Sequence, residues 1–323
     1  MTRSLDTTSV TDPDHVAPRV LIGWRPRVYR LHPGPLHLTR RYLQLAAGVS
    51  AQETRLLTGG LRIDGHIGPG MLKIGFVRSS EIRILGSCVR EPFMALAGAG
   101  GRLNFSTMFP GSALTLHLDQ EVALQAISAN GVFLLTQWLQ GGGGPETLLR
   151  PVTRTGGVLE KLLRRLLARE KGESGAAELI EAEEVIAASA RLIEEFVGSA
   201  EEPFTPSRRR RDLALTVEGL LWEAPEKKGR FSLDDAARRL KCSRRSIQLA
   251  LQEEFGLGFV ALKRSIRLQQ VHAILRQNPE GAAGIGRIAK AHEFNHLGRF
   301  AGHYREMFGV LPSLERPEGA GAV

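Results

Sequence analysis

Ile285–Ser313, IGRIAKAHEFNHLGRFAGHYREMFGVLPS, contains two short helical patterns separated by a break. Apolar residues recur three or four positions apart on either side of the break, as they do in amphipathic helices: Ile285, Ile288 and Ala289 come before it, and Phe300, Tyr304 and Phe308 come after it. Phe294 lies within the break, where its ring can fill the angle between the helices. Two short helices joined by a tight turn predict a helix-turn-helix unit.

A related pattern occurs 53 residues earlier in the chain. At this offset two core positions and a Phe-Gly pair coincide: Ile247 with Phe300, Leu251 with Tyr304, and Phe255-Gly256 with Phe308-Gly309. From the Ala of the first helix, Ala237 or Ala289, to the first core residue of the second helix there are ten residues in one copy and eleven in the other. The repeat therefore predicts two helix-turn-helix units whose turns differ by one residue.

The first copy also carries helix-capping signals. Ser232 precedes a helix whose first turn holds Asp234 and Asp235, where negative charge complements the helix dipole. Ser243 precedes the second helix, SRRSIQLALQEEFG. We therefore expect one helix to begin after Ser232 and another after Ser243.

A continuous helical pattern, Phe259–Gln277, joins the two copies. Its inward positions are predicted to be Leu262, Ile266, Val271, Ile274 and Leu275. About 20 helical residues span about 30 Å, close to the ~34 Å that separates major-groove faces on one side of B-DNA. A rigid helix here would hold the two units at a spacing suited to adjacent turns of DNA.

The outer faces of the second helices carry the candidate DNA-reading residues. With Ile247 and Leu251 facing inward, the first unit leaves four polar side chains outside: Arg244, Arg245, Gln248 and Gln252. Arg can pair with the guanine edge and Gln with the adenine edge in the major groove. In the second unit the candidates are His296 and Arg299, followed by Asn295 and His303. The alternative is that these side chains only solvate a helix surface.

His292–His296, HEFNH, also matches the H-E-x-x-H pattern of zinc proteases. In a zinc protease both histidines lie on one uninterrupted helix, whereas here His292 ends one helix and His296 begins the next, with Asn295 as a possible cap between them. The longer protease pattern is absent too, because Arg299 and Gly302 occupy the positions of its Gly and His. We therefore predict no metal site.

The charge of the chain is concentrated in its C-terminal part. The net charge is +9, and residues 207–318 hold 21 Lys and Arg against 13 Asp and Glu, a net of +8. A basic excess confined to one region is typical of a protein that binds a polyanion such as nucleic acid. No apolar run approaches the ~20 residues that cross a bilayer, and the start of the chain lacks a secretory signal. Cys88 and Cys242 form no C-x-x-C motif. We expect a cytoplasmic protein without membrane contact.

The N-terminal half has a different texture. Residues 1–22 are polar and are expected to form a mobile tail. Residues 23–150 show short apolar runs broken by Gly and Pro, which predicts an antiparallel β sandwich or barrel. Residues 151–206 contain two amphipathic helices, within Val158–Val197, that either pair two subunits or pack on their own β domain. A Pro-bearing hinge with four consecutive arginines, Arg208–Arg211, marks the boundary of the DNA-binding domain, which is predicted over residues 207–318.

These residues resemble the AraC/XylS-type transcription regulators over about Ser207–Ser313. The matching positions are Ala237, Ser243 and Arg245 in the first unit, Arg267 and Leu268 in the linker helix, and Phe294, Phe300, Tyr304-Arg305, Phe308-Gly309 and Pro312-Ser313 in the second unit. Three positions depart from the pattern: Glu293 replaces a usual Gly, Gly298 a usual Ser, and Leu311 a residue that is commonly polar.

The resemblance implies an α+β protein in which a cupin-like β domain senses a small molecule or mediates dimerisation. Cupin metal sites use clustered histidines, but His32, His37, His66 and His117 are scattered. We therefore expect neither a metal nor another cofactor.

The leading hypothesis is a dimeric, effector-responsive regulator, for instance an activator, that binds double-stranded DNA and contacts RNA polymerase. Two alternatives remain. One is an enzyme-like β domain fused to a DNA-binding module, although no catalytic constellation stands out in residues 1–150 and we expect no enzyme activity. The other is an architectural DNA binder without an effector.

Overall fold

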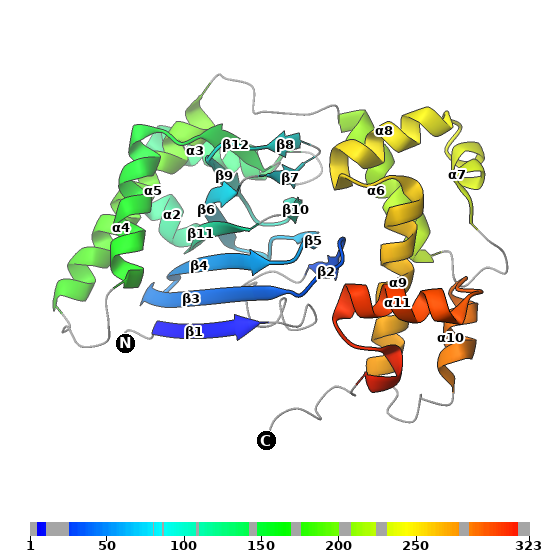
Figure 1. Cartoon of the computed structure of the whole chain (residues 1–323). Helices are drawn as coiled ribbons and strands as arrows, with labels where there is room; N and C mark the ends of the chain where they lie inside the picture. The colour runs from blue at the N-terminus through cyan, green and yellow to red at the C-terminus, as the bar shows by residue number, and fades with distance from the viewer. Residues whose placement is uncertain are drawn as a thin grey trace.

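The chain folds into an N-terminal β domain and a C-terminal helical domain that lie side by side (Figure 1). The computed structural model describes residues 5–10, 26–79, 81–85, 87–107, 110–141, 147–168, 176–199, 208–223, 231–277 and 284–315. None of the helices in these ranges is both long and apolar enough to cross a membrane.

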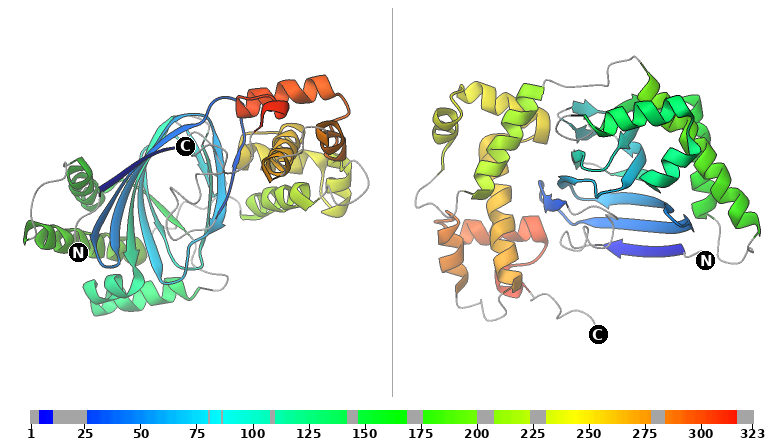
Figure 2. Two further views of the ribbon diagram at one scale, coloured as in Figure 1. Left: turned by 90° about the horizontal axis from the view of Figure 1, so that it is seen from below. Right: turned by 180° about the vertical axis from the view of Figure 1, so that it is seen from behind.

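Two antiparallel sheets form the β domain, which confirms the predicted β-rich architecture. The seven-stranded sheet has the order β1 (Leu5–Val10), β3 (His37–Ala46), β4 (Val49–Thr58), β11 (Gly111–Asp119), β6 (Met71–Ser79), β9 (Phe93–Ala97) and β12 (Leu148–Pro151). The five-stranded sheet has the order β2 (Arg27–Arg30), β5 (Leu61–His66), β10 (Arg102–Thr107), β7 (Ile82–Ile84) and β8 (Ser87–Val89). The five-stranded sheet faces the helical domain (Figure 2).

Strand β1 corrects the prediction of a mobile tail over residues 1–22. Leu5–Val10 pairs with the edge of β3 over six positions, from Leu5 opposite Leu43 to Val10 opposite Leu38. The β-branched residues of LDTTSV favour an extended backbone, and a sheet edge offers unpaired backbone groups to it. The remainder of the predicted tail lies outside the described residues.

Four helices pack on the outer face of the seven-stranded sheet (Figure 2). They are α2 (Gln120–Ala126), α3 (Ala129–Leu139), α4 (Arg154–Ala168) and α5 (Ala176–Gly198). Leu159 and Leu163 of α4 and Ile193 of α5 lie in one core with Leu72 and Phe76 of β6. The amphipathic helices predicted within Val158–Val197 thus bury their apolar face on their own β domain, and these side chains are not available to a second subunit.

The helical domain contains the two predicted helix-turn-helix units. Its elements are α6 (Arg208–Glu223), α7 (Leu233–Arg239), α8 (Arg244–Phe255), α9 (Phe259–Gln277), α10 (Ile285–Ala291), α11 (Leu297–Phe308) and the 3₁₀ turn η4 (Pro312–Leu314). Four residues separate α7 from α8 and five separate α10 from α11, so the turns differ in length by one residue, as the repeat predicts.

The linker helix α9 has the predicted bounds, but one of its predicted core residues is wrong. Leu262, Ile266, Val271 and Leu275 are buried, whereas Ile274 is 36% exposed. The first half of α9 packs into the core of the first unit and the second half packs, through its opposite face, into the core of the second. Ile274 lies between these two faces, which a single apolar stripe could not anticipate.

Candidate nucleic-acid interface

The first helix-turn-helix unit is fixed by the two predicted caps. Ser232 accepts a hydrogen bond from the backbone N–H of Asp235 at 3.1 Å, and the Asp235 carboxylate accepts one from the N–H of Ser232 at 2.8 Å, which completes a capping box. Ser243 accepts from the N–H of Ser246 at 3.0 Å. Behind these caps Ile247 is fully buried, so the rotation of α8 about its own axis is set.

This rotation exposes Arg244, Arg245 and Gln252. The side chain of Gln248 is half-buried and forms a hydrogen bond within the protein. The side-chain oxygen of Gln248 accepts a hydrogen bond from the N–H of Phe259 at 3.2 Å, at the start of α9. Arg244 forms an exposed ion pair with Asp234 at 2.8 Å, and Gln252 donates to the carbonyl of Gly256 at 3.1 Å. Arg245 thus lies in the middle of the free surface near the start of α8.

Leu249 shares the exposed face of α8, and the sequence reasoning missed it. Its side chain is 43% exposed. Its position two residues after buried Ile247, on the opposite side of the helix, was the available signal. An exposed apolar side chain on such a face can contact a thymine methyl group.

In the second unit the structure separates the four candidate residues into two groups. Asn295, His296 and Arg299 are exposed at the start of α11. His303 instead lies 3.5 Å from the Glu306 carboxylate and borders a small cavity next to Leu31, on the side of the β domain. The helix N-cap is His296, without a side-chain hydrogen bond, so the suggested cap at Asn295 is wrong.

The outer face of α11 has no side chain at Gly298 and Gly302. A Cβ placed on Gly298 or on Gly302 would meet no atom of the described residues within 4 Å. Side chains are therefore absent from two positions on this face, and another backbone can approach the helix closely there.

Glu293, which departs from the family pattern, occupies a left-handed position in the turn. Its φ is 70°, a conformation that favours glycine, and Lys241 in the first turn has φ 50°. The Glu293 carboxylate compensates by pairing with Lys263 at 2.5 Å and Arg267 at 3.3 Å, both on α9. The side chain that glycine lacks thus ties the second turn to the linker helix.

The HEFNH histidines lie where the helical phase predicts. His292 is the C-cap of α10, and His296 is the N-cap of α11. His292 is buried, and burial together with nearby Arg267 lowers its pKa. Within the described ranges, no group of three or more His, Cys, Asp or Glu side chains is placed to hold a metal ion.

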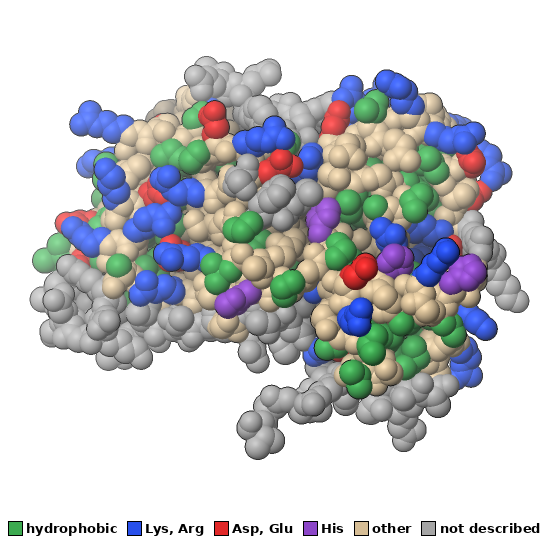
Figure 3. All heavy atoms as spheres, in the orientation of Figure 1, with side chains coloured by type: hydrophobic (Ala, Val, Ile, Leu, Met, Phe, Trp, Pro, Cys, Tyr) green, Lys and Arg blue, Asp and Glu red, His purple; other side chains and the backbone are tan. Residues whose placement is uncertain are grey.

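The two units stack along α9, with the starts of α8 and α11 on the side away from the β domain (Figure 1). Lys and Arg side chains follow this outer edge of the helical domain (Figure 3). The C-terminal turns of both helices point the other way, toward the β domain: Arg83 donates to the carbonyl of Glu253 at 2.8 Å, and the N–H of Gly34 donates to the carbonyl of Glu306 at 2.8 Å.

A buried group of five side chains, here called the interdomain cluster, joins the domains: Tyr29, Arg62, Glu218, Glu254 and Phe255. Arg62 on β5 is fully buried and lies 2.9 Å from the Glu254 carboxylate on α8 and 3.5 Å from Glu218 on α6. The Tyr29 hydroxyl donates to Glu218 at 2.6 Å. The Arg62 guanidinium also lies over the Phe255 ring, 4.6 Å from its centre.

The charges of the cluster are coupled. Burial alone would lower the pKa of Arg62, but the carboxylates of Glu218 and Glu254 raise it above its usual value. Burial raises the pKa of Glu254, against the opposing effect of Arg62. Arg62 is therefore the cation that contacts both buried carboxylates of the helical domain, and Arg211 adds a weaker attraction to Glu254.

The predicted hinge at Arg208–Arg211 is instead the first turn of α6. Arg has a high helix propensity, and no proline interrupts the chain from Arg208 to Glu223. Arg210 pairs with Glu253 of α8 at 2.5 Å, and Arg211 donates to Asn104 of β10 at 3.4 Å. The Arg210 pair lies within the helical domain, and the Arg211 contact joins that domain to the β domain. The Pro-bearing part of the predicted hinge, residues 201–207, lies outside the described residues.

The five-stranded sheet separates the helical domain from a cavity inside the β domain. Leu61, Ile63 and Ile84 line the cavity. Arg62 lies between Leu61 and Ile63 in its strand, and Arg83 directly precedes Ile84. Both arginines contact the helical domain. Because side chains alternate along a strand, one layer of backbone connects the cavity with α8.

Comparison with known proteins finds sequence similarity in the helical domain. Residues 236–316 match a family model described as a helix-turn-helix domain. The C-terminal region is a helix-turn-helix domain. The chain is 36% identical to a probable thc operon regulatory protein of Rhodococcus erythropolis over 83 residues. These 83 residues are 26% of this chain. The chain thus aligns with only a quarter of the length of that relative.

Solved structures of AraC-type proteins are similar over longer stretches but at lower identity. The AraC-like transcriptional activator CuxR has a TM-score of 0.40 and 13% identity, with 83% of this chain and 96% of that chain covered. ToxT from Vibrio cholerae has a TM-score of 0.29 and 11% identity, with 97% of each chain covered. A probable AraC family regulator from Rhodopseudomonas palustris CGA009 has a TM-score of 0.28 and 27% identity over 32% of this chain and 92% of its own.

Proposed function

We propose that this protein is a sequence-specific transcription regulator that reads two adjacent major-groove segments per subunit. The observation that carries the proposal is the pair of helix-turn-helix units whose recognition helices, α8 and α11, both begin on the outer side of α9. The 19 residues of α9 extend over about 28 Å at ~1.5 Å per residue, near the ~34 Å repeat of B-DNA.

Within this interface Arg245 and Arg299 are the proposed guanine-reading residues, because both are exposed near the starts of their helices. Arg244, Gln252, Asn295 and His296 are proposed to add polar contacts to bases or phosphates. Leu249 is proposed to contact a thymine methyl group, and the face of α11 at Gly298 and Gly302 to admit the DNA backbone. Gln248 remains a candidate whose side chain must first leave the backbone of Phe259, and His303 remains one whose side chain must first leave Glu306.

The β domain is proposed to control DNA binding through the interdomain cluster. This cluster holds the last turn of α8, and the cavity behind the five-stranded sheet is a suitable place for a small-molecule effector. We further propose a domain boundary near residue 207, a homodimer, contact with RNA polymerase, activator function, a cytoplasmic location and no enzyme activity. Since the apolar face of α4 and α5 is buried, the dimer interface must lie elsewhere than on that face.

The test is a genome-wide map of bound DNA followed by binding assays on an enriched site and on a scrambled duplex. The Arg245→Ala variant should lose about 1 to 3 kcal/mol of binding free energy on the enriched site and much less on the scrambled duplex. Arg165→Ala, an exposed arginine on α4, serves as the control. Equal losses on both duplexes would assign Arg245 to phosphate contact, and equal affinity of the wild type for both would favour an architectural DNA binder.

A further inference from the structure

The cavity between the two sheets exists because small residues lie side by side on the seven-stranded sheet. Thr115 of β11 is paired with Gly75 of β6, and Gly75 is paired in turn with Ala95 of β9. All three residues line the cavity. Among the described residues, a Cβ placed on Gly75 would meet only the Cβ of Ala95, at 3.9 Å. The sheet therefore leaves open space in front of Gly75.

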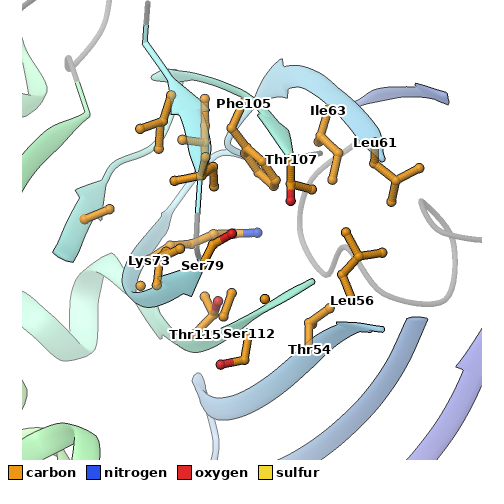
Figure 4. Close-up of a pocket in the computed structure, with 18 of the residues that line it drawn as sticks. Thr54, Leu56, Leu61, Ile63, Lys73, Ser79, Phe105, Thr107, Ser112 and Thr115 are labelled. Atoms are coloured by element: carbon orange, nitrogen blue, oxygen red, sulfur yellow. The ribbon is translucent and has the colours of Figure 1, made fainter. Parts of the chain in front are cut away.

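The opposite wall of the cavity carries large apolar side chains from the five-stranded sheet. Leu61, Ile63, Ile84 and Phe105 line it, and Figure 4 shows Ile63 and Phe105 across the space from Thr115. The cavity has a volume of about 160 Å³. Engineered apolar cavities of about 150 Å³ bind benzene. A molecule about the size of a single ring therefore fits between the sheets.

His117 brings an unsatisfied polar group to this space. It lies two residues after Thr115 on β11, and both side chains line the cavity. The His117 side chain is buried, with an exposed fraction of 4%, and neither of its ring nitrogens has a hydrogen-bond partner among the described residues. A buried nitrogen in this state destabilises the protein until another group supplies the missing hydrogen bond.

His117 differs in this respect from the other polar residues of the lining. Among the described residues that line the cavity, it alone has buried side-chain nitrogen or oxygen atoms without a hydrogen bond. Gln52 of β4 accepts a hydrogen bond from Arg40 at 3.1 Å and donates one to Thr54 at 2.8 Å. Lys73, the cross-strand neighbour of His117, has an interaction partner as well. The polar group of a ligand therefore gains most at His117.

The imidazole of His117 is neutral at pH 7. Burial lowers its pKa well below the usual value, and the nearby charges of Lys73 and Arg40 lower it further. A neutral imidazole has one N–H donor and one acceptor nitrogen. A hydroxyl group can pair with either nitrogen, because it both donates and accepts hydrogen bonds. A charged ligand would lose its hydration against the apolar wall.

We propose that the cavity binds a neutral, single-ring hydroxyl compound, such as a phenol, with its hydroxyl group at His117 and its ring between the sheets. The ring fills the space in front of Gly75, and the hydroxyl group supplies a hydrogen bond that His117 lacks. A sugar would leave most of its hydroxyl groups without partners on the apolar wall, and a hydrocarbon would leave His117 unsatisfied. The ligand class is that of the effector of the proposed regulator, so its role in regulation rests on the proposed function.

Fluorine NMR titration of the full chain at pH 7 with para-fluorophenol and para-fluorotoluene tests the site. The probes differ by a hydroxyl group in place of a methyl group of similar size, and a phenol is neutral at this pH. His117→Phe keeps a ring and loses both nitrogens, so the ratio of phenol affinity to toluene affinity should fall at least fivefold, equivalent to about 1 kcal/mol. The hydration of the free probes cancels, because it is the same for both proteins. His66→Phe, at an exposed position at the end of β5, should leave the ratio unchanged.

Gly75→Val fills the cavity from β6 and keeps His117, so it should weaken the binding of both probes. No binding of the phenol to the wild type, or the same affinity ratio in the wild type and in His117→Phe, would overturn the proposed site. So would an equal fall of the ratio in His66→Phe, or unchanged binding in Gly75→Val. DNA binding of the same preparations, measured without probe, reports separately on the proposed function: its absence in the wild type would refute the regulator and not the hydroxyl site.

Discussion

Replacing Arg62 with Met should release α8 from the β domain. The substitution keeps much of the side-chain volume but leaves Glu218 and Glu254 buried without their cation. Removing one partner of a buried ion pair typically costs about 3 to 5 kcal/mol. Both carboxylates belong to the helical domain and regain water when the domains separate, so the loss falls on the closed arrangement. A loss of about 3 kcal/mol shifts the ratio of closed to open molecules roughly 150-fold.

Hydrogen exchange and DNA affinity measure this shift. In Arg62→Met the amides of the last turn of α8 and of β5 should exchange faster than in the wild type, while those of α4 should not change. If the closed arrangement restrains the helical domain, DNA affinity should rise as well. Arg55→Met is the matched control, because Arg55 pairs with Glu53 at 3.0 Å but its side chain is 55% exposed, and exposed pairs contribute only about 0 to 1 kcal/mol.

A double variant separates lost attraction from the penalty of an unpaired carboxylate. Arg62→Met combined with Glu254→Gln should exchange more slowly in α8 than Arg62→Met alone, because one buried charge has been removed together with its partner. Unchanged exchange in both α8 and β5 of Arg62→Met, with the same thermal stability as Arg55→Met, would refute the assignment of the cluster as the contact that holds the domains together.

Two further predictions concern the second turn and the cavity. Glu293→Gly and Glu293→Ala both lose the ion pairs to α9, but only Ala keeps a Cβ at φ 70°, so thermal unfolding should show the Ala variant less stable than the Gly variant by about 1 kcal/mol; equal stability would mean that the turn relaxes. His117, buried next to Lys73 and near Arg40, has a pKa well below its usual value, so the unfolded chain binds a proton first and stability should fall as the pH drops below about 6.5, by up to about 1.4 kcal/mol per pH unit. Urea unfolding from pH 7 to 5 should show a shallower decline for His117→Gln than for the wild type, and parallel curves would exclude His117 as the cause.

The helical domain was predictable because its signals are local. The spacing of Ile247 and Leu251, the caps at Ser232 and Ser243 and the bounds of α9 all follow from residues within one or two helical turns. Gln248 and His303 could not be placed in the same way. Gln248 accepts a hydrogen bond from Phe259, and His303 borders the cavity next to Leu31. Both placements depend on how α8 and α11 meet other elements.

The contacts between the domains were beyond the sequence. Arg62 and Glu254 are 192 residues apart, and nothing near Arg62 distinguishes it from an exposed strand arginine. The same holds for Lys73 and His117, which become neighbours only through the register of β6 and β11. The tail segment Leu5–Val10 was misjudged because a short polar strand is stable only against a partner edge that the local sequence does not show.

The single backbone layer between the cavity and α8 affects how such a protein can evolve. Leu61 and Ile63 face the cavity and Arg62 faces the helical domain, so neighbouring codons of one strand control different surfaces. Substitutions at the lining positions can change which molecule fits while the contact with α8 stays intact. New ligand preferences can therefore arise by single mutations without rebuilding the connection to the DNA-binding units.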